Sequence, residues 1–143
     1  MKKLFVFSAS LAALLLSACA GPRAPLEIKA PAPVQTENVM TVRSLVLPYD
    51  SSIKLETAFE QYGGCVPKTR EWAEVEPGRV QFSCRMDDGV VLQFDWEVRP
   101  GRDPKLKRFV YTSMNDPEYA GLALLGPQAE EALKNVYENA PLF

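Results

Sequence analysis

The amino-acid sequence predicts an α+β fold: a small antiparallel β-sheet meander packed by one N-terminal helix, with helical segments at the C-terminal end. Two observations carry this prediction. Apolar and polar side chains alternate along two adjacent segments between residues 79 and 98, as in paired strands with one buried face. A stripe of apolar residues at helical spacing precedes them, between residues 55 and 62.

The paired strands are predicted over residues 79–86 and 90–98, and the loop length sets their register. A two-residue loop at Asp88-Gly89 would place apolar residues opposite polar ones. A three-residue loop of Asp87-Asp88-Gly89 instead sets Phe82 opposite Phe94 and makes every inward pair apolar. These pairs are Met86 with Val90, Cys84 with Leu92, Phe82 with Phe94, and Val80 with Trp96. Gly89 suits the left-handed position that such loops require.

The N-terminal helix is expected from about Ser52 to Tyr62. Asp50-Ser51-Ser52 supplies good N-cap residues, and Gly63-Gly64 would end the helix. Its apolar stripe consists of Leu55, Ala58, Phe59 and Tyr62. The preceding Val39–Leu47 is rich in β-branched residues, which predicts a short strand or an extended lead-in.

Two further strands complete the predicted meander. Lys68–Val75 would form one, turned by Pro77-Gly78, although Trp72 and Ala73 cannot both point inward. Leu106–Met114 would form the other. Since sequential strands usually neighbour one another, the sheet is expected to be an antiparallel meander.

The C-terminal part is expected to be helical. Asp116-Pro117-Glu118 has the composition of a helix start. Gly126-Pro127 would begin a second helix. Its apolar stripe would be Ala129, Ala132, Leu133, Val136 and Tyr137.

The N-terminal segment carries the one motif with a functional meaning. Lys2 and Lys3 precede an apolar run that ends in Leu16-Ser17-Ala18-Cys19. The run is shorter than the roughly 20 residues that span a bilayer. It resembles the signal peptide of a bacterial lipoprotein, with Leu16–Cys19 as the lipobox. The resemblance implies cleavage before Cys19, acylation of Cys19, and anchoring to the envelope; an ordinary secretory signal that contains a cysteine is the alternative. Ala20, where some species use Asp for inner-membrane retention, favours the outer membrane.

The predicted organisation therefore has three parts. Residues 1–18 form the signal peptide, and residues 19–38 form a tether rich in Pro and Ala, including Pro22, Pro25, Pro31 and Pro33. Residues 39–143 form the periplasmic domain. The expected partners are the membrane, through the lipid, and another envelope protein.

Once Cys19 is acylated, Cys65 and Cys84 remain as an even pair in an oxidising compartment. This context predicts a structural disulfide between them. A metal pair or redox-active thiols are the alternatives, but the sequence has no CxxC spacing and no histidine to complete a common zinc site. Neither a metal nor a cofactor is expected.

Composition excludes several classes of function. The net charge of −2 gives no case for nucleic-acid binding. The absence of histidine removes Ser-His-Asp and Cys-His catalysis. No catalytic residue is expected, although two acid pairs are the candidates for a carboxylate-dependent enzyme. Asp95 and Glu97 are expected on the solvated face of a strand, and Glu130 and Glu131 in the first turn of a helix.

One basic cluster is a candidate binding site. It consists of Arg99, Arg102, Lys105, Lys107 and Arg108, within ten positions and tempered by Asp103. Such a cluster on a tethered lipoprotein would suit an anionic surface. The favoured interpretation is a solvated hairpin end whose charges keep the sheet soluble.

These observations predict a lipid-anchored envelope protein with a non-catalytic interaction or structural role. The domain pattern resembles the small one-helix, antiparallel-sheet modules that recur in bacterial lipoproteins, many of them without known function. A periplasmic inhibitor or ligand-binding lipoprotein is the alternative, and it would need a protruding loop or an apolar pocket. Lysozyme inhibitors are also small β-rich lipoproteins, but their short Ser-Gly loop motif is not seen here.

Overall fold

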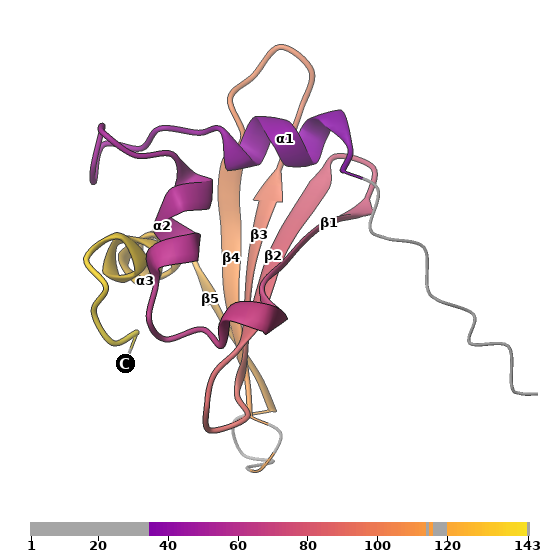
Figure 1. Ribbon diagram of the computed structural model, residues 1–143. Coiled ribbons are helices and arrows are strands. Elements are labelled where there is room, and N and C mark those ends of the chain that lie inside the picture. Colours follow the sequence, from indigo (N-terminus) through magenta and orange to yellow (C-terminus); the bar gives the residue numbers. More distant parts are fainter. Residues whose placement is uncertain (1–34, 114, 116–119, 143) are drawn as a thin grey trace, which may run out of the picture. The chain divides into compact units, whose positions relative to one another are not determined.

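A computed structural model describes residues 35–113, 115 and 120–142 of the 143-residue chain (Figure 1). In chain order, the elements are α1 (Glu37–Arg43), α2 (Leu55–Gln61), the short 3-10 turn η1 (Pro67–Thr69), β1 (Glu71–Glu76), β2 (Arg79–Arg85), β3 (Val91–Glu97), β4 (Lys105–Thr112), β5 (Ala120–Leu125) and α3 (Pro127–Tyr137). The α+β class predicted from the sequence is therefore confirmed.

The five strands form one antiparallel sheet in the order β1-β2-β3-β4-β5. The predicted antiparallel meander is confirmed for β1 to β4, and β5 is a fifth strand that the sequence analysis did not predict. The β2–β3 register is also the predicted one, with Phe82 opposite Phe94 and Cys84 opposite Leu92. The three-residue loop closes as expected, because Met86 N donates to Val90 O at 2.8 Å and Gly89 has φ +86°.

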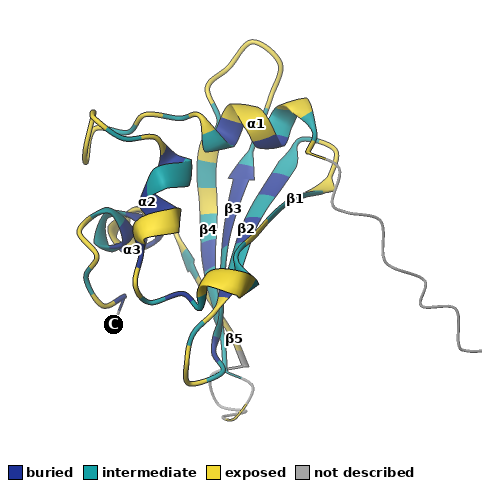
Figure 2. Cartoon of the chain, in the orientation of Figure 1, coloured by how far each residue is buried: buried dark blue, intermediate teal, exposed yellow. Residues whose placement is uncertain are grey.

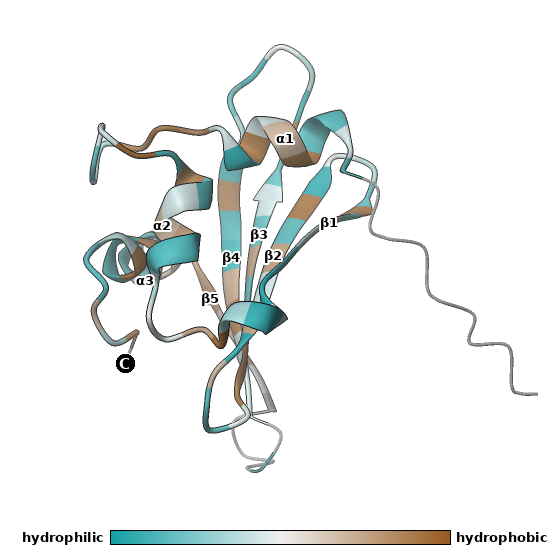
Figure 3. Cartoon of the chain, viewed as in Figure 1, coloured by the Kyte–Doolittle hydropathy of each residue, from teal (hydrophilic) through white to brown (hydrophobic). Residues whose placement is uncertain are grey.

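All three helices pack against one face of the sheet, here called the covered face. Strand residues on this face are buried together with helical residues such as Val39, Phe59 and Leu133 (Figure 2). Figure 3 colours the same ribbon by hydropathy and shows hydrophobic stretches on α1, β2 and β4. Phe59 is central, with its ring 4.0 Å from that of Phe82 and 5.2 Å from that of Phe94. The opposite face, here called the open face, carries Gln81, Gln93 and Asp95 among others.

The predicted strand or extended lead-in at Val39–Leu47 is wrong over its first half, where α1 forms instead. The hydroxyl of Thr36 caps the helix by accepting a hydrogen bond from Val39 N at 3.3 Å. Val39 and Val42 are both fully buried, and their spacing of three residues is helical. Burial of this pair outweighs the weak strand preference of β-branched residues.

The predicted cap of α2 is also wrong. The Asp50 carboxylate accepts hydrogen bonds from Ser52 N at 2.9 Å and from Ser52 Oγ at 2.6 Å, so it closes a local turn instead of capping a helix. The helix begins at Leu55, after Lys54, which makes no capping hydrogen bond through its side chain. The predicted stripe is nonetheless correct, because Leu55, Ala58, Phe59 and Tyr62 are all buried.

The expected helix starting at Asp116-Pro117-Glu118 does not continue along the chain as predicted. Residues 116–119 lie outside the described residues, and Ala120–Leu125 forms strand β5 against β4. Gly121, with φ +86°, lies where the β4–β5 register shifts. The second predicted helix is confirmed as α3, with Ala129, Ala132, Leu133 and Val136 buried in the core.

Cys65 and Cys84 are bonded, with their Cα atoms 5.7 Å apart, as predicted. The bond joins the loop after α2 to the covered face of β2. In the first strand, Trp72 and not Ala73 points toward the core. Trp72 pairs with Phe82 and packs its ring on those of Phe59 and Trp96.

Candidate anion-binding site

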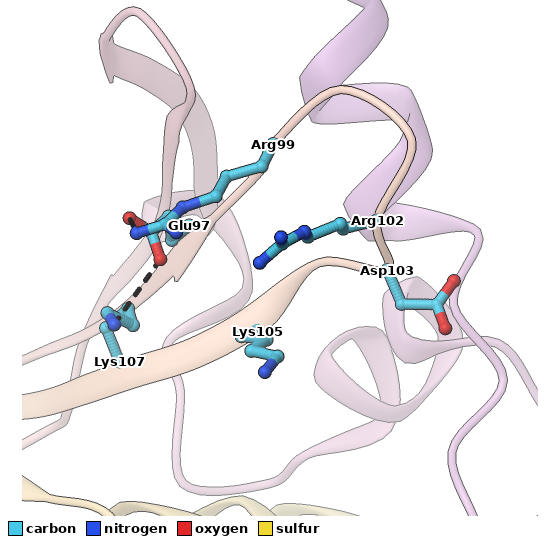
Figure 4. A pocket seen from close by; sticks show the side chains of 6 residues that line it. All are labelled: Glu97, Arg99, Arg102, Asp103, Lys105 and Lys107. Atoms are coloured by element: carbon cyan, nitrogen blue, oxygen red, sulfur yellow. Dashed lines mark hydrogen bonds and ion pairs between the residues drawn. The ribbon is translucent and has the colours of Figure 1, made fainter.

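The β3–β4 hairpin ends in a small basic pocket of about 130 Å³ (Figure 4). Its lining residues, here called the basic pocket, are Glu97, Arg99, Arg102, Asp103, Lys105 and Lys107. The lining contains four cationic side chains and two carboxylates, which leaves an excess of two positive charges. The sequence-predicted cluster is therefore largely brought together in space.

Backbone contacts hold the hairpin in place. Val98 N donates to Gly78 O at 2.7 Å, which ties the hairpin to the β1–β2 turn. Gly78 has φ +75°, and a Cβ there would lie 2.7 Å from Val98 O, so only glycine fits this approach. At the tip, Arg102 N donates to Arg99 O at 3.2 Å.

Glu97 organises one side of the pocket. Its carboxylate pairs with Arg99 Nη2 at 2.7 Å and with Lys107 Nζ at 3.3 Å. A bulge in the β3–β4 pairing leaves Lys107 without a residue opposite it, and Figure 4 shows its ammonium reaching Glu97. The hydrogen bond from Arg99, followed by that from Lys107, lowers the pKa of the Glu97 carboxyl.

Arg102 and Lys105 differ from the other cations of the pocket. Both are exposed, and neither makes an ion pair with any residue in the described part of the chain. Figure 4 shows Arg102 extending between Arg99 and Lys105, while the Asp103 carboxylate points away from them. Among the described residues of the pocket, these two cations are the ones free to meet an external anion.

Arg108 does not line the basic pocket but lies beside it on the open face, in an adjoining pocket of about 420 Å³ that shares Glu97, Arg99 and Lys107 with the basic pocket. It forms an ion pair with Asp95, whose other oxygen accepts a hydrogen bond from Gln81 Nε2 at 2.8 Å. The expectation that Asp95 is solvated is wrong, since only 1% of its surface is exposed. Its position on a central strand explains this, because Gln81 on β2 and Arg108 on β4 flank it and cover it.

An apolar groove of about 490 Å³ adjoins the basic pocket and shares Lys105 with it. Eight of its ten lining residues are apolar or aromatic, and the other two are Lys105 and Glu130. The eight are Leu45, Leu47, Pro48, Tyr49, Trp96, Pro104, Leu106 and Leu133. This groove could not be predicted from the sequence, because its walls come from four segments that are distant along the chain.

The tyrosines beside this groove resist ionisation. The rings of Tyr49 and Tyr137 lie 5.5 Å apart. Burial, followed by the charge of Asp50, raises the pKa of Tyr137 to about 12. Burial and the nearby Glu130 also raise the pKa of Tyr49. Both side chains are therefore neutral near neutral pH.

The other candidate residues stand as follows. Cys19 lies outside the described residues. Glu130 is in the first turn of α3, as expected, and Glu131 lies 3.7 Å from Lys134 Nζ.

Within residues 35–113, 115 and 120–142, no three His, Cys, Asp or Glu side chains are grouped so that they could hold a metal ion. No helix in this part of the chain is both long and apolar enough to cross a membrane.

In comparisons with known proteins, no family model, no curated protein and no solved structure matches this chain.

Proposed function

We propose that this chain is a lipid-anchored protein of the bacterial cell envelope whose domain acts by binding, and that the basic pocket contacts the phosphate groups of an anionic membrane surface. The observation that carries this proposal is the pair of cations without an ion-pair partner among the described residues, Arg102 and Lys105, in a pocket with excess positive charge. Each lysine or arginine held near an anionic membrane contributes about 1 kcal/mol to the free energy of membrane binding.

Two features support an envelope location. The Leu16–Cys19 motif follows a short apolar run with a basic start. The Cys65–Cys84 disulfide would persist in an oxidising compartment such as the periplasm, whereas disulfides are rare in the reducing cytosol. A stretch rich in Pro and Ala between the anchor and α1 would give the domain reach above the membrane.

The anchor is tested by mass spectrometry of the mature N-terminus, with and without globomycin, which blocks lipoprotein signal cleavage. We expect the mature chain to begin at a lipid-modified Cys19 and Cys19→Ser to abolish the modification. Cleavage at any other position, or a mature terminus without lipid mass, contradicts the proposal.

The pocket is tested separately with residues 19–143 carrying Cys19→Ser, which removes the lipid and leaves the domain and tether. We expect the domain to bind phosphatidylglycerol vesicles at low salt and not to bind phosphatidylcholine vesicles. The domain should leave the phosphatidylglycerol vesicles as added salt shortens the Debye length to about 8 Å near physiological ionic strength. Inorganic phosphate, added at constant ionic strength, should displace the vesicles if the pocket recognises an isolated phosphate. It should have little effect if the pocket recognises a charged surface.

Substitutions sharpen this test. Arg102→Gln with Lys105→Gln should abolish vesicle binding. Lys68→Gln with Arg85→Gln makes the same change of charge at exposed positions near the other end of the sheet, and should leave binding largely unchanged. Equal losses in both double variants would show that only the net charge matters, and would refute a role for the pocket.

Glu97→Gln provides the opposite change. Removing this carboxylate frees Arg99 and Lys107, so vesicle binding should become tighter. Since the Glu97 pKa is lowered, the wild-type protein should show the same gain only as the pH falls below the ordinary glutamate range, near 4.5. Unchanged binding by Glu97→Gln would count against the pocket.

The apolar groove supports a second candidate function, binding of a single amphiphile whose anionic head reaches Lys105. The observation that favours it is the continuity of the groove with the basic pocket through that residue. A fluorescent fatty acid should then bind the domain in the absence of vesicles, and Leu47→Glu should abolish this binding. Absence of binding by the wild-type domain would rule this function out.

A further inference from the structure

Strand β5 forms an uncharged edge of the sheet. It is the last strand in the sheet order, and no other strand in the described part of the chain pairs with its outer side. Its sequence from Ala120 to Leu125 contains no charged or polar side chain. Two large side chains are left in solvent, with Leu122 44% and Leu125 61% exposed.

The two exposed leucines lie on different faces. Leu122 pairs with Tyr111 and Leu124 with Phe109, so both lie on the covered face. Ala123 pairs with Val110 and Leu125 with Arg108, which places them on the open face. The strand therefore presents apolar side chains above and below a row of backbone N–H and C=O groups that no strand among the described residues pairs with, which is a template for another strand.

We propose that β5 pairs antiparallel with β5 of a second copy of this chain, in a register centred on Ala123. Two antiparallel copies are related by a two-fold axis perpendicular to the sheet, so residues opposite each other lie on the same face. The two-fold axis must therefore lie between one residue and the same residue of the second copy, so that this residue pairs with itself. Centring it on Ala123 sets Leu122 opposite Leu124 of the second copy, and Leu125 opposite Gly121.

This register covers both exposed leucines with apolar or glycine neighbours. It also sets Ala123 opposite itself, so the tightest point of the interface carries two small side chains. The helices of both copies lie on the same side of a continuous sheet, because the axis preserves the faces.

A second copy fits the edge because the strand is complementary to itself. Because β5 carries no charge, two copies of it can meet without the like-charge repulsion that disfavours the pairing of charged strands. The opposite edge, β1, carries Glu71, Glu74 and Glu76, and its register is broken between the last two. Pairing of β5 with β1 of another copy is thereby disfavoured, which favours a closed dimer over an open fibre.

The interface is small. A stable dimer usually buries about 800 Å² on each partner, which is more than a six-residue strand edge supplies alone. We therefore expect weak association, and its test is a covalent trap.

The test uses the full chain with Ala123→Cys, expressed in a bacterial envelope and oxidised before non-reducing electrophoresis. Residues directly opposite across antiparallel strands have Cα atoms about 4.5–5.5 Å apart, a distance that a disulfide can bridge. We expect a covalent dimer for this variant. The wild type controls for Cys19, Cys65 and Cys84, and Val75→Cys supplies a matched thiol on β1, where Val75 is 40% exposed. Neither control should form a covalent dimer.

Mass spectrometry of the dimer must find two copies of the β5 peptide joined through the introduced thiols at position 123. The intact Cys65–Cys84 peptide in the same sample shows that the variant folds. Three results would each overturn the proposal: a dimer of Val75→Cys in equal yield, linkage of the position-123 thiol to a different protein, or no linkage at position 123 in folded protein.

Discussion

The two edges of the sheet are built in opposite ways. β1 carries three glutamates, and Glu74 accepts hydrogen bonds from Asn38 Nδ2 at 2.7 Å and from Gly78 N at 2.8 Å. These contacts attach α1 and the β1–β2 turn to the edge. β5 has no charged side chain and joins α3 directly through Gly126. Natural sheets protect their edges with charges and irregular pairing, so the contrast identifies β1 as the protected edge and β5 as the edge available to a partner.

The interior follows the same division. On the β1 side, Phe59 packs against a set of aromatic rings, and the Cys65–Cys84 bond links β2 to the loop after α2. On the β5 side, the strand is held by pairing with β4 and by α3, whose buried residues are small or aliphatic. Four variants test this division, in order of decreasing expected effect on stability.

Phe59→Ala should cause the largest loss. The side chain is 1% exposed and contacts four aromatic rings, those of Trp72, Phe82, Phe94 and Trp96. Truncating such a residue costs about 3–5 kcal/mol of unfolding free energy. Urea denaturation followed by tryptophan fluorescence measures it. A loss below about 1 kcal/mol would show that this aromatic cluster does not hold the domain together.

Cys65→Ser with Cys84→Ser should be next. Removing a native disulfide from a small secreted domain costs about 2–5 kcal/mol. The loss should be reproduced in the wild type by a reducing agent, measured in the same urea titration. If the reduced wild type keeps its full stability, the bond does not stabilise the β1 side.

Glu74→Gln should have a smaller effect, of at most about 1 kcal/mol, because this carboxylate is near solvent. Hydrogen bonds from Thr36, Asn38 and Gly78 lower its pKa, so its contribution is present above the ordinary glutamate pKa of 4.5 and is lost as the pH falls through the lowered value. The unfolding free energies of the wild type and the variant should therefore converge as the pH falls below the lowered pKa of Glu74. A difference that persists unchanged at low pH would show that the charge is not responsible.

Leu125→Lys should barely change stability, by about 0.5 kcal/mol or less, since the side chain is exposed. Val75→Lys, on the other edge, is the matched control and should be equally mild. The two should differ in association, because only the lysine on β5 would place charge at the proposed interface. Sedimentation velocity over a range of concentrations makes this comparison, and equal behaviour of both variants would contradict the difference between the edges.

The parts of the fold that could be predicted from the sequence are those set by local pattern. The β2–β3 register follows from alternation and from one glycine in the loop, and the α2 and α3 stripes follow from helical spacing. β5 and α1 could not be obtained in this way. Both are short, and their conformation depends on partners that are distant along the chain: β4 for Ala120–Leu125, and the core for Val39 and Val42.

In the candidate site, too, local sequence pattern does not predict the contacts between residues that are distant along the chain. The density of positive charge between residues 99 and 108 is visible in the sequence, but the pairing within it is not. Glu97 and Arg99 are close along the chain, whereas the contact of Lys107 with Glu97 depends on a bulge. The burial of Asp95 depends on two neighbouring strands, so alternation alone places it in solvent.

The difference between the two edges is tested most directly by hydrogen–deuterium exchange on the wild-type full chain at low and high protein concentration. We expect peptides covering β5, residues 120–125, to exchange more slowly as concentration rises, because pairing with a second copy protects their backbone amides. Peptides covering β1, residues 71–76, should exchange at the same rate throughout. Exchange in β5 that is independent of concentration, or equal slowing at both edges, would contradict the assignment of β5 as the interaction edge.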